Sequence, residues 1–417
     1  MLYLGIDFGT SGARAIVINE PEHIQFETHC LFAENQSNNL VNIWANTLDQ
    51  LLYSIPVEIR QKISAIAING TSSTVLLCDS QGNPIDDPIL YNDARGKIVL
   101  EKIEKIAPKG HLVCSATSSL AKLFWWQQTP IFEEACYLLH QADWLGFLLH
   151  GKLGISDYHN ALKLGYDVEN LCYPDWLLNL PISSILPQVL PPGTVVATIK
   201  LEIIKHFNFN PNCLVCTGTT DSIAAFLASQ VKQPGEAVTS LGSTLVLKLL
   251  SQTPVNDSSS GIYSHRFGDL WLTGGASNTG GAVLKQFFNS QKLEDLSKKI
   301  EINKPTNLDY YPLLKPGERF PINDPNLSPK LKQKPDNPII FLQGLLESMA
   351  KIEALGYLKL QQLGATPVTQ VYTAGGGAKN QTWTKIREDY LKVPVTISRQ
   401  TEAAYGTALL AKRSRLC

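Results

Sequence analysis

Hydrophobic and polar residues at the start of the chain form two short alternating runs, which are separated by a turn of small residues. Leu4 and Ile6 lie on one face of the first run, whereas Asp7 lies on the other face, at the end of the run. The turn at residues 9–12 offers two glycines and two hydroxyls, and Arg14 follows it. The pattern predicts a β-hairpin whose N–H groups and hydroxyls can close around a phosphate, and Asp7 suits the metal ion of such a phosphate.

The same arrangement recurs at residues 238–250, which again read as a strand, a glycine with hydroxyl residues, and a second strand. Ser240 to Thr244 align with Asp7 to Ser11, so Ser240 takes the place of Asp7. Two equivalent hairpins indicate a duplicated domain that holds a nucleoside triphosphate between its copies. Only the first copy is expected to bind the metal ion.

Hydrophobic spacing along the rest of the chain predicts alternating strands and helices, which is the pattern of an α/β protein. The predicted strands are residues 24–31, 63–68, 74–78, 213–217, 263–273 and 368–374, and the predicted helices are residues 41–52, 120–127, 137–149, 222–229, 340–363 and 401–412. In the helix at 340–363, Leu355 and Leu358 are expected on the buried face. The proline-rich segment 303–338 is expected to be an extended surface loop.

Three polar clusters lie at the ends of these predicted elements. Ser72 and Ser73 follow a strand, Asp93 and Arg95 lie in a loop, and Asp221 lies at the start of a helix. Each cluster has an ordinary structural explanation: a turn that caps a strand, a surface ion pair, and a helix N-cap worth about 1 kcal/mol. The same residue types also bind sugars, because carboxylates and hydroxyls form hydrogen bonds with sugar hydroxyls.

These motifs, taken together, resemble those of the FGGY family of carbohydrate kinases. They occur in the order seen in that family and span nearly the whole chain, as Asp7 to Ser11, Tyr91 to Arg95, Asp221 after a Gly-Thr turn, Ser240 to Thr244, and Gly375 to Asn380. The resemblance implies an α/β fold with two actin-like (ribonuclease H-like) domains, each a mixed sheet flanked by helices, and a central cleft for ATP and sugar.

The resemblance also implies how the chain is divided. A sugar-binding N-terminal domain is expected at residues 1–226, and a nucleotide-binding C-terminal domain at residues 227–399. A final helix within residues 400–417 is expected to return to the first domain.

The positions of the family motifs give each candidate residue a role. Asp221 becomes the catalytic base, and Asp7 becomes a second catalytic carboxylate and the Mg²⁺ ligand. The residues expected to bind the sugar are Asp7, Ser72, Ser73, Asp93, Arg95 and Asp221. The residues expected to bind ATP are Thr10, Ser11, Gly12, Arg14, Gly242, Ser243, Thr244, Gly281, Lys285, Gly376, Gly377 and Asn380.

The expected activity is an ATP-dependent phosphorylation of the terminal hydroxyl of a ketopentose. The chain resembles the short cyanobacterial and plant xylulokinase-like branch, which implies conversion of D-ribulose to D-ribulose 5-phosphate. FGGY xylulokinases typically have Met-His in place of Ser72-Ser73, so a D-xylulose kinase is the alternative. A weakly active sugar-binding ATPase of the same fold is a further alternative, against which the intact Asp7 and Asp221 argue. An actin-like or chaperone-like ATPase should carry inserts that this sequence lacks.

The composition of the chain limits the classes of molecule that it is expected to bind. The chain has 417 residues, of which 44% are hydrophobic, enough for two or three domains, and its net charge of −1 excludes a broad basic face for nucleic acid or anionic membranes. No apolar run reaches about 18 residues, so no membrane-spanning helix is expected. The spacing of the eight cysteines does not suggest a disulfide framework, so a cytoplasmic protein with free thiols is expected. Its partner is expected to be a small sugar, and the protein is expected to be a monomer or a homodimer. The sequence contains no P-loop and no dinucleotide fingerprint.

Overall fold

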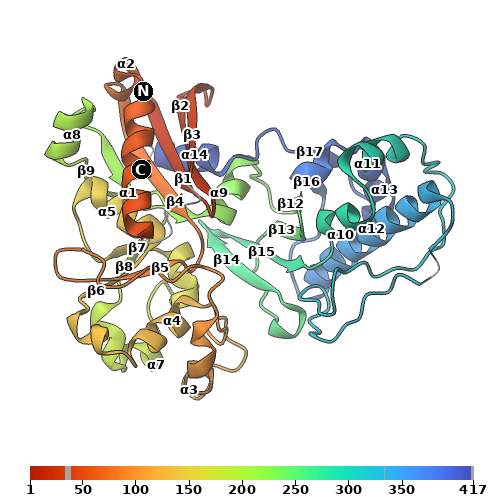
Figure 1. The fold of residues 1–417 in the computed structure, drawn as a ribbon, viewed down its shortest axis with the longest axis horizontal. Coiled ribbons are helices and arrows are strands. Elements are labelled where there is room, and N and C mark those ends of the chain that lie inside the picture. The colour runs from red at the N-terminus through yellow and green to blue at the C-terminus, as the bar shows by residue number, and fades with distance from the viewer. Residues whose placement is uncertain (33–38, 333, 415–417) are drawn as a thin grey trace. The chain divides into compact units, whose positions relative to one another are not determined.

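The computed structural model describes residues 1–32, 39–332 and 334–414, and the chain forms two compact units (Figure 1). Unit 1 contains Met1–Ala228 together with Glu402–Cys417, and unit 2 contains Ser229–Thr401. Residues 415–417 of the expected C-terminal helix lie outside the described residues. No helix in the described ranges combines the length and the hydrophobicity needed to span a membrane.

Unit 1 is built on a seven-stranded mixed sheet in the order β3-β2-β1-β4-β10-β9, with β11 beside β4. Two small two-stranded sheets, β5 with β6 and β7 with β8, accompany it. The strands are β1 (Leu2–Phe8), β2 (Gly12–Asn19), β3 (Ile24–Leu31), β4 (Ile63–Gly70), β5 (Val75–Cys78), β6 (Tyr137–His140), β7 (Ile155–Asp157), β8 (Gln188–Leu190), β9 (Val195–Thr198), β10 (Leu214–Cys216) and β11 (Thr219–Thr220).

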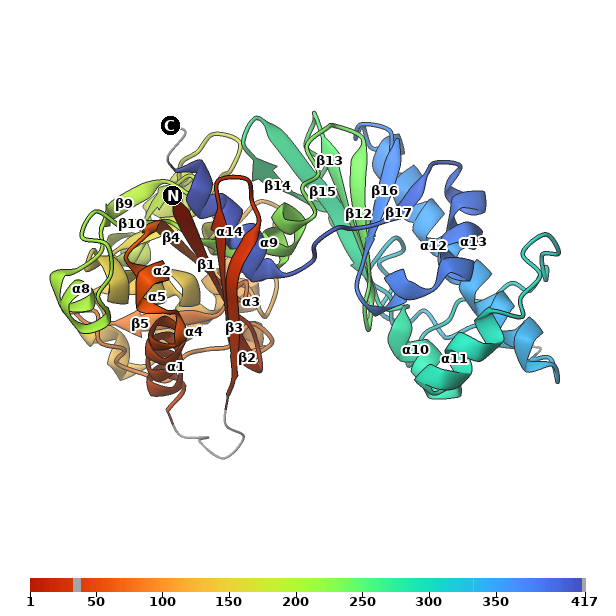
Figure 2. The same ribbon diagram turned by 90° about the horizontal axis from the view of Figure 1, so that it is seen from above.

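Helices cover both faces of this sheet (Figure 2). The helices of unit 1 are α1 (Leu40–Ser54), α2 (Val57–Arg60), α3 (Leu100–Glu104), α4 (Ser119–Trp126), α5 (Gln141–His150), α6 (Tyr158–Ala161), α7 (Asp175–Leu178), α8 (Leu201–Phe207), α9 (Asp221–Ala228) and α14 (Ala403–Arg413). Of these, α3, α4 and α7 pack in a separate core with β5 and β6. Leu4 and Ile6 of β1 pack with Trp44 of α1 on one face. Tyr3, on the opposite face of the same strand, packs with Ala404 of α14. Alternation along β1 therefore directs Asp7 toward the side covered by α9 and α14.

Unit 2 is built on a six-stranded sheet in the order β14-β15-β13-β12-β16-β17. Its strands are β12 (Glu236–Leu241), β13 (Leu245–Ser251), β14 (Tyr263–Phe267), β15 (Leu270–Ser277), β16 (Gln370–Ala374) and β17 (Val395–Ile397), and its helices are α10 (Gly281–Phe287), α11 (Ser290–Ser297), α12 (Pro338–Gln362) and α13 (Gln381–Leu391). Leu247, Met349 and Ile386 join β13, α12 and α13 in one hydrophobic core.

The two sheets repeat one pattern of strand pairing. β1 pairs antiparallel with β2 and parallel with β4, and β12 pairs antiparallel with β13 and parallel with β16. Asp7 lies opposite Asn69 of β4, and Ser240 lies opposite Ala374 of β16. The register therefore agrees with the predicted alignment of Ser240 with Asp7, and the α/β fold of two sheet-containing domains is confirmed.

Three expectations about individual elements are wrong. Residues 137–149 are not one helix, because Tyr137–His140 pairs with β5 as β6 before α5 begins. Residues 263–273 are not one strand but belong to the hairpin of β14 and β15. Leu355 and Leu358 of α12 are 43% and 49% exposed rather than buried, because here the helix faces the core through Ile352, Gly356, Tyr357 and Leu360.

The proline-rich segment 303–338 is irregular, as expected, but it is not entirely a surface loop. Phe320 is completely buried and belongs to the core of unit 2, and Glu318 is buried as well. Glu318 accepts hydrogen bonds from the Ser277 hydroxyl and the Asn278 N–H, both at 2.6 Å. These contacts attach the segment to the end of β15. All seven cysteines in the described ranges are free thiols, as predicted.

Candidate functional site

Two carboxylates of unit 1 meet at one edge of the sheet because a strand ends and a helix begins there. Asp7 is the penultimate residue of β1, and Asp221 is the first residue of α9. Asp7 lies opposite Asn69 of β4, and Asn69 lies opposite Thr219 of β11. Only Thr220 separates Thr219 from Asp221, so the pairing of β1, β4 and β11 fixes the two carboxylates relative to each other.

The surroundings of Asp7 hold its carboxylate in an unusual protonation state. Burial and the charges of Asp221 and Glu402 raise the pKa of Asp7 from 3.8 to about 7, against the opposing effect of Arg14. Its Oδ1 atom is buried and accepts no hydrogen bond from any described residue. A buried carboxylate oxygen without a donor, facing other carboxylates, is suited to a cation ligand.

Asp221 is held differently. Its Oδ1 accepts a 2.6 Å hydrogen bond from the Ser222 N–H in the first turn of α9, and the side chain is only partly buried. The positive end of the helix dipole favours the ionised form of a carboxylate at this position. The expected N-terminal helix position of Asp221 is therefore present in the structure.

The turn between β1 and β2 leaves its hydroxyls accessible. The Gly9 N–H donates to the Gly12 carbonyl at 3.0 Å, and Thr10 and Ser11 at the tip of this turn are exposed to solvent. Arg14, which was expected to bind phosphate, forms an ion pair with Glu402, the residue that precedes α14. Two helices, α9 and α14, thus begin beside the turn, and helix N-termini attract anions.

The two serines of the expected sugar site lie in different environments. Ser72 is half-buried, whereas Ser73 is 2% exposed and has a positive φ of 66°. The Ser73 hydroxyl forms no hydrogen bond with any described residue. A non-glycine residue in this backbone region is strained, and such strain is typical of ligand sites.

Lys122 of α4 joins this loop to the second predicted sugar cluster. Its Nζ donates to the Ser73 carbonyl at 2.6 Å and to the Leu90 carbonyl at 2.8 Å. Burial lowers the pKa of Lys122 to about 7, although the charge of Asp93 opposes this effect. Lys122 was not among the residues predicted from the sequence to form the site. It could have been found as the single charged residue in the mostly apolar sequence of α4.

Asp93 and Arg95 form a compact ion pair beside Lys122. The Asp93 Oδ2 accepts hydrogen bonds from Arg95 Nε at 3.0 Å and Nη2 at 2.7 Å, and Arg95 lowers the pKa of Asp93. The Arg95 guanidinium also lies 4.6 Å from the centre of the Trp125 ring. Trp126 and Trp144 are buried in the core, whereas the Trp125 ring contacts the Arg95 guanidinium.

Unit 2 contains a cavity of about 860 Å³. The residues expected to bind ATP that line it are Gly242, Ser243, Gly281, Lys285, Gly376, Gly377 and Asn380. Thr244 is not among its lining residues, and instead its carbonyl accepts a 3.2 Å hydrogen bond from the Gly242 N–H that closes the turn. The volume is within the range of small-molecule sites.

Backbone contacts explain why this cavity is lined by glycines. The Gly281 N–H donates to the Gly242 carbonyl at 2.9 Å, and a Cβ at residue 281 would lie 2.6 Å from the same oxygen. Trp383 of α13 also lines the cavity, and it was not among the residues predicted from the sequence to bind ATP. The indole Nε1 of Trp383 is buried and has no acceptor among the described residues. The apolar spacing of α13 predicts a core residue here rather than a ligand donor.

Comparison with known proteins shows which family this chain belongs to. The sequence matches the N-terminal domain of the FGGY family of carbohydrate kinases over residues 2–228, and the C-terminal domain over residues 237–414. It is similar to a xylulose kinase of Staphylococcus epidermidis, with 22% identity over 98% of this chain and 87% of the relative. It is equally similar to a gluconokinase of Bacillus subtilis, with 22% identity over 96% of this chain and 85% of the relative.

The fold gives the same result. The structure superimposes on a ligand-bound xylulose kinase from Lactobacillus acidophilus with a TM-score of 0.86 and 18% identity, covering 99% of this chain and 89% of that chain. The resemblance seen in the motifs is confirmed. The chain belongs to the FGGY family of carbohydrate kinases, which transfer a phosphoryl group from ATP to a sugar.

Proposed function

We propose that this kinase phosphorylates the terminal hydroxyl of a ketopentose, and that its preferred substrate is D-ribulose. The observation that carries the proposal is the meeting of Asp7 and Asp221 at the edge of the unit 1 sheet, beside a loop of small hydroxyl residues. A phosphoryl transfer needs a positioned acceptor oxygen and a group that receives its proton. Asp221 is suited to receive the proton, because its helix position favours the ionised carboxylate.

The reaction balances with these residues. The terminal oxygen of the sugar forms a bond to the γ-phosphorus of ATP while the bond from that phosphorus to the bridging oxygen breaks, and ADP leaves. The hydroxyl proton passes to Asp221. Because the transition state is loose, the alignment of the hydroxyl oxygen contributes more than the basicity of Asp221.

We propose that Asp7 is the protein ligand of Mg²⁺. Its buried Oδ1 without a hydrogen-bond donor fits a hard cation, and cation binding would neutralise the charge that raises its pKa. The residues that the structure describes contain no group of three or more His, Cys, Asp or Glu able to hold a metal. Mg²⁺ commonly uses one protein carboxylate together with phosphate oxygens and water, and there it neutralises phosphate charge.

The sugar is proposed to lie against Ser72 and the Asp93–Arg95 pair. D-ribulose and D-xylulose differ only in the configuration at C3, so the discrimination depends on which side chain can reach that hydroxyl. The half-buried Ser72 presents a small hydroxyl, which supports a pocket different from the Met-His pocket of the family's xylulokinases. D-xylulose remains the second candidate, because relatives that match nearly the whole chain are named xylulose kinases.

We propose that the adenosine of ATP binds in the cavity of unit 2. Glycine backbone at Gly376 and Gly377 allows close approach, Leu284 and Leu293 supply apolar contacts, and the buried Trp383 Nε1 offers an unused donor. Apolar contacts combined with polar groups that fix the orientation are typical of small-molecule sites.

A substrate screen tests this proposal. ADP release is measured with D-ribulose, D-xylulose, D-gluconate and glycerol as acceptors, and the highest kcat/KM is expected with D-ribulose. A higher kcat/KM with D-xylulose would transfer the assignment to the second candidate. A clear preference for gluconate or glycerol would overturn the ketopentose assignment, and ADP release that no acceptor stimulates would leave only an ATPase.

A further inference from the structure

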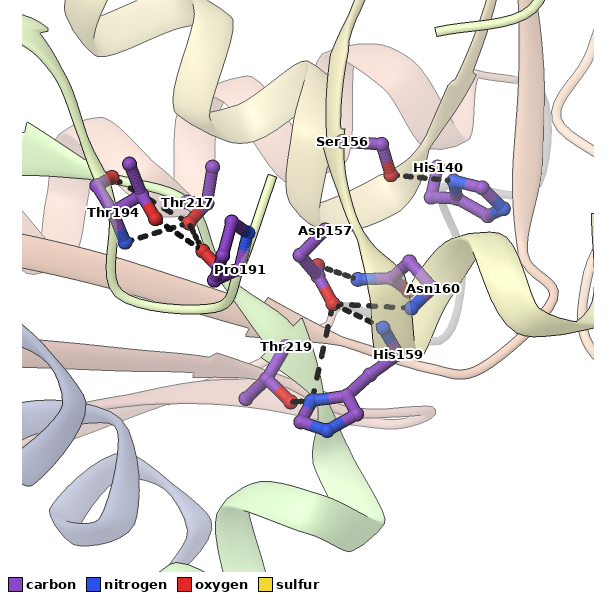
Figure 3. Close-up of polar contacts among 9 residues, drawn as sticks. All are labelled: His140, Ser156, Asp157, His159, Asn160, Pro191, Thr194, Thr217 and Thr219. Atoms are coloured by element: carbon purple, nitrogen blue, oxygen red, sulfur yellow. Dashed lines mark hydrogen bonds and ion pairs between the residues drawn. The ribbon is translucent and has the colours of Figure 1, made fainter. Parts of the chain in front are cut away.

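Unit 1 contains a buried polar cluster at the end of β7 to which the mechanism above gives no role (Figure 3). The Asp157 Oδ1 accepts hydrogen bonds from the backbone N–H groups of His159 at 2.8 Å and Asn160 at 3.1 Å. The Asp157 Oδ2 accepts a 2.6 Å bond from the Asn160 side chain. All three residues are at most 4% exposed. The carboxylate therefore fixes the first turn of α6 and the backbone of His159.

The His159 ring stays beside this cluster, with its Nδ1 atom 3.9 Å from the Asp157 Oδ1, and it also reaches the strand that leads to Asp221. Its Nδ1 lies 2.7 Å from the Oγ1 of Thr219, as Figure 3 shows, although the two residues are 60 positions apart. Thr219 is completely buried, so its hydroxyl does not face bulk solvent. Because a buried hydroxyl that loses its partner is costly, this contact fixes the Thr219 side chain.

The strand held by this contact is short. β11 has two residues, Thr219 and Thr220, which lie opposite Asn69 and Gly70 of β4, and Asp221 follows directly. Two residues of parallel pairing provide few backbone hydrogen bonds. The His159 contact is thus a side-chain anchor at the residue just before Thr220, in the row that also contains Asp7.

We propose that His159 is a positioning residue that sets the orientation of Asp221 through the hydroxyl of Thr219. This inference rests on the proposed role of Asp221 as the proton acceptor. A displacement of about 1 Å between an acceptor hydroxyl and its partner lowers turnover by about 10²-fold. Most of the residues proposed to bind the sugar, and the cavity proposed for adenosine, lie outside this contact. Loss of the contact should therefore lower kcat and leave KM and nucleotide affinity nearly unchanged.

Two substitutions of His159 separate positioning from packing. His159→Asn keeps a polar atom near the place of Nδ1 but leaves a void where the rest of the ring was, so Tm should fall while kcat stays within about 3-fold of the native value. His159→Leu keeps more of the volume and removes the hydrogen bond, so kcat should fall by about 10-fold or more. If the variant with the lower Tm also had the lower kcat, the proposal would be overturned, because a residue that contributes only to packing would give that result.

Thr219→Val supplies the second test, and it is nearly isosteric. It should lower kcat as His159→Leu does. The kcat of the double variant should be no lower than that of either single variant, because both substitutions remove the same contact. Thr217→Val is the matched control. The Thr217 hydroxyl donates to the Pro191 carbonyl at 2.8 Å and accepts from the Thr194 N–H at 3.0 Å, away from His159, so its loss should lower Tm without lowering kcat. Additive losses in the double variant, or equal kcat losses in the two valine variants, would contradict the proposal.

A failure of the positioning role of His159 can be distinguished from a failure of the proposed function. If Asp221→Asn retains its turnover, the assignment of the base fails, whatever the His159 variants do. If Asp221→Asn loses turnover while His159→Leu and Thr219→Val keep it, only the positioning role fails. Should the His159 variants not fold, Thr219→Val and Thr217→Val carry the comparison alone.

Discussion

The charge of Asp221 and the burial of Asp7 act in the same direction on Asp7, raising its pKa to about 7. Two carboxylates brought together by β1 and α9 repel each other, and the helix position favours ionisation of Asp221 rather than Asp7. The pair therefore divides two tasks. The carboxyl group with the raised pKa is the one with a buried oxygen free for a cation, and the other, at the helix N-terminus, is placed to receive a proton.

The raised pKa of Asp7 predicts a specific pH dependence of stability. Between pH 4 and about 7, the folded protein keeps a proton on Asp7 that the unfolded chain loses, so the free energy of unfolding falls as pH rises, by at most about 1.4 kcal/mol per pH unit. Asp7→Asn cannot titrate and escapes this loss. Its Tm relative to the native protein should increase from pH 4.5 to 7 and then level off, and a difference that stays constant with pH would refute the shift.

Asp221→Asn should lower sugar-dependent turnover by at least about 10²-fold, because an amide cannot accept the hydroxyl proton. Nucleotide affinity should be retained, since Asp221 is not among the residues expected to bind ATP, and the cavity proposed for adenosine is lined by residues of unit 2. The assay is ADP release with saturating sugar, together with titration calorimetry of ADP. Asp175→Asn, at the exposed first position of α7, is the matched control and should keep full turnover. Native kcat in Asp221→Asn would remove this residue from the mechanism.

Lys122→Met should raise the sugar KM by about 10-fold and lower Tm. The substitution leaves the Ser73 and Leu90 carbonyls without their donor, at a cost of roughly 1–3 kcal/mol each if they stay buried, and the two sugar loops lose their connection. Steady-state kinetics with ATP saturating measure the effect. Lys109→Met, at an exposed position in the turn after α3, should change neither KM nor Tm. An unchanged KM in Lys122→Met would show that the loops hold the sugar independently of each other.

Local patterns in the sequence were sufficient for the parts of the fold that depend on neighbouring residues. The hairpin at Asp7 and its copy at Ser240 are visible because alternation and small residues are local signals, and the family resemblance added the roles. β6 was missed because a short, mostly apolar segment fits a strand as well as a helix, and its partner strand β5 lies far away along the chain.

Contacts between distant segments were beyond the sequence for a physical reason. The ion pair of Arg14 with Glu402 and the bond of His159 to Thr219 arise only after the sheet has brought these segments together. Neither residue type carries a periodic signal of its own, because a polar residue on a helix or loop is usually solvated. Lys122 was the exception, since its isolation among apolar residues of α4 marks a buried charge that needs partners.

Gly406→Ala should destabilise unit 1 although alanine favours helices by about 1 kcal/mol. A Cβ at residue 406 of α14 would lie 1.8 Å from the Ala224 carbonyl of α9, and such overpacking typically costs about 1–3 kcal/mol. Gly146→Ala in α5 is the control, because its Cβ would meet only the His150 side chain at 3.3 Å. Thermal unfolding should show a lower Tm for Gly406→Ala and an unchanged or higher Tm for Gly146→Ala.

The same substitution should also reach the active site. Relief of the clash at Ala224 requires α9 to move away from α14, and Asp221 is the first residue of α9. We therefore expect kcat to fall with Tm in Gly406→Ala. ADP affinity should change less, because the cavity proposed for adenosine is lined by residues of unit 2. A lower Tm with native kcat would mean that β11 and the Thr219 anchor hold Asp221 in place even when the rest of its helix shifts.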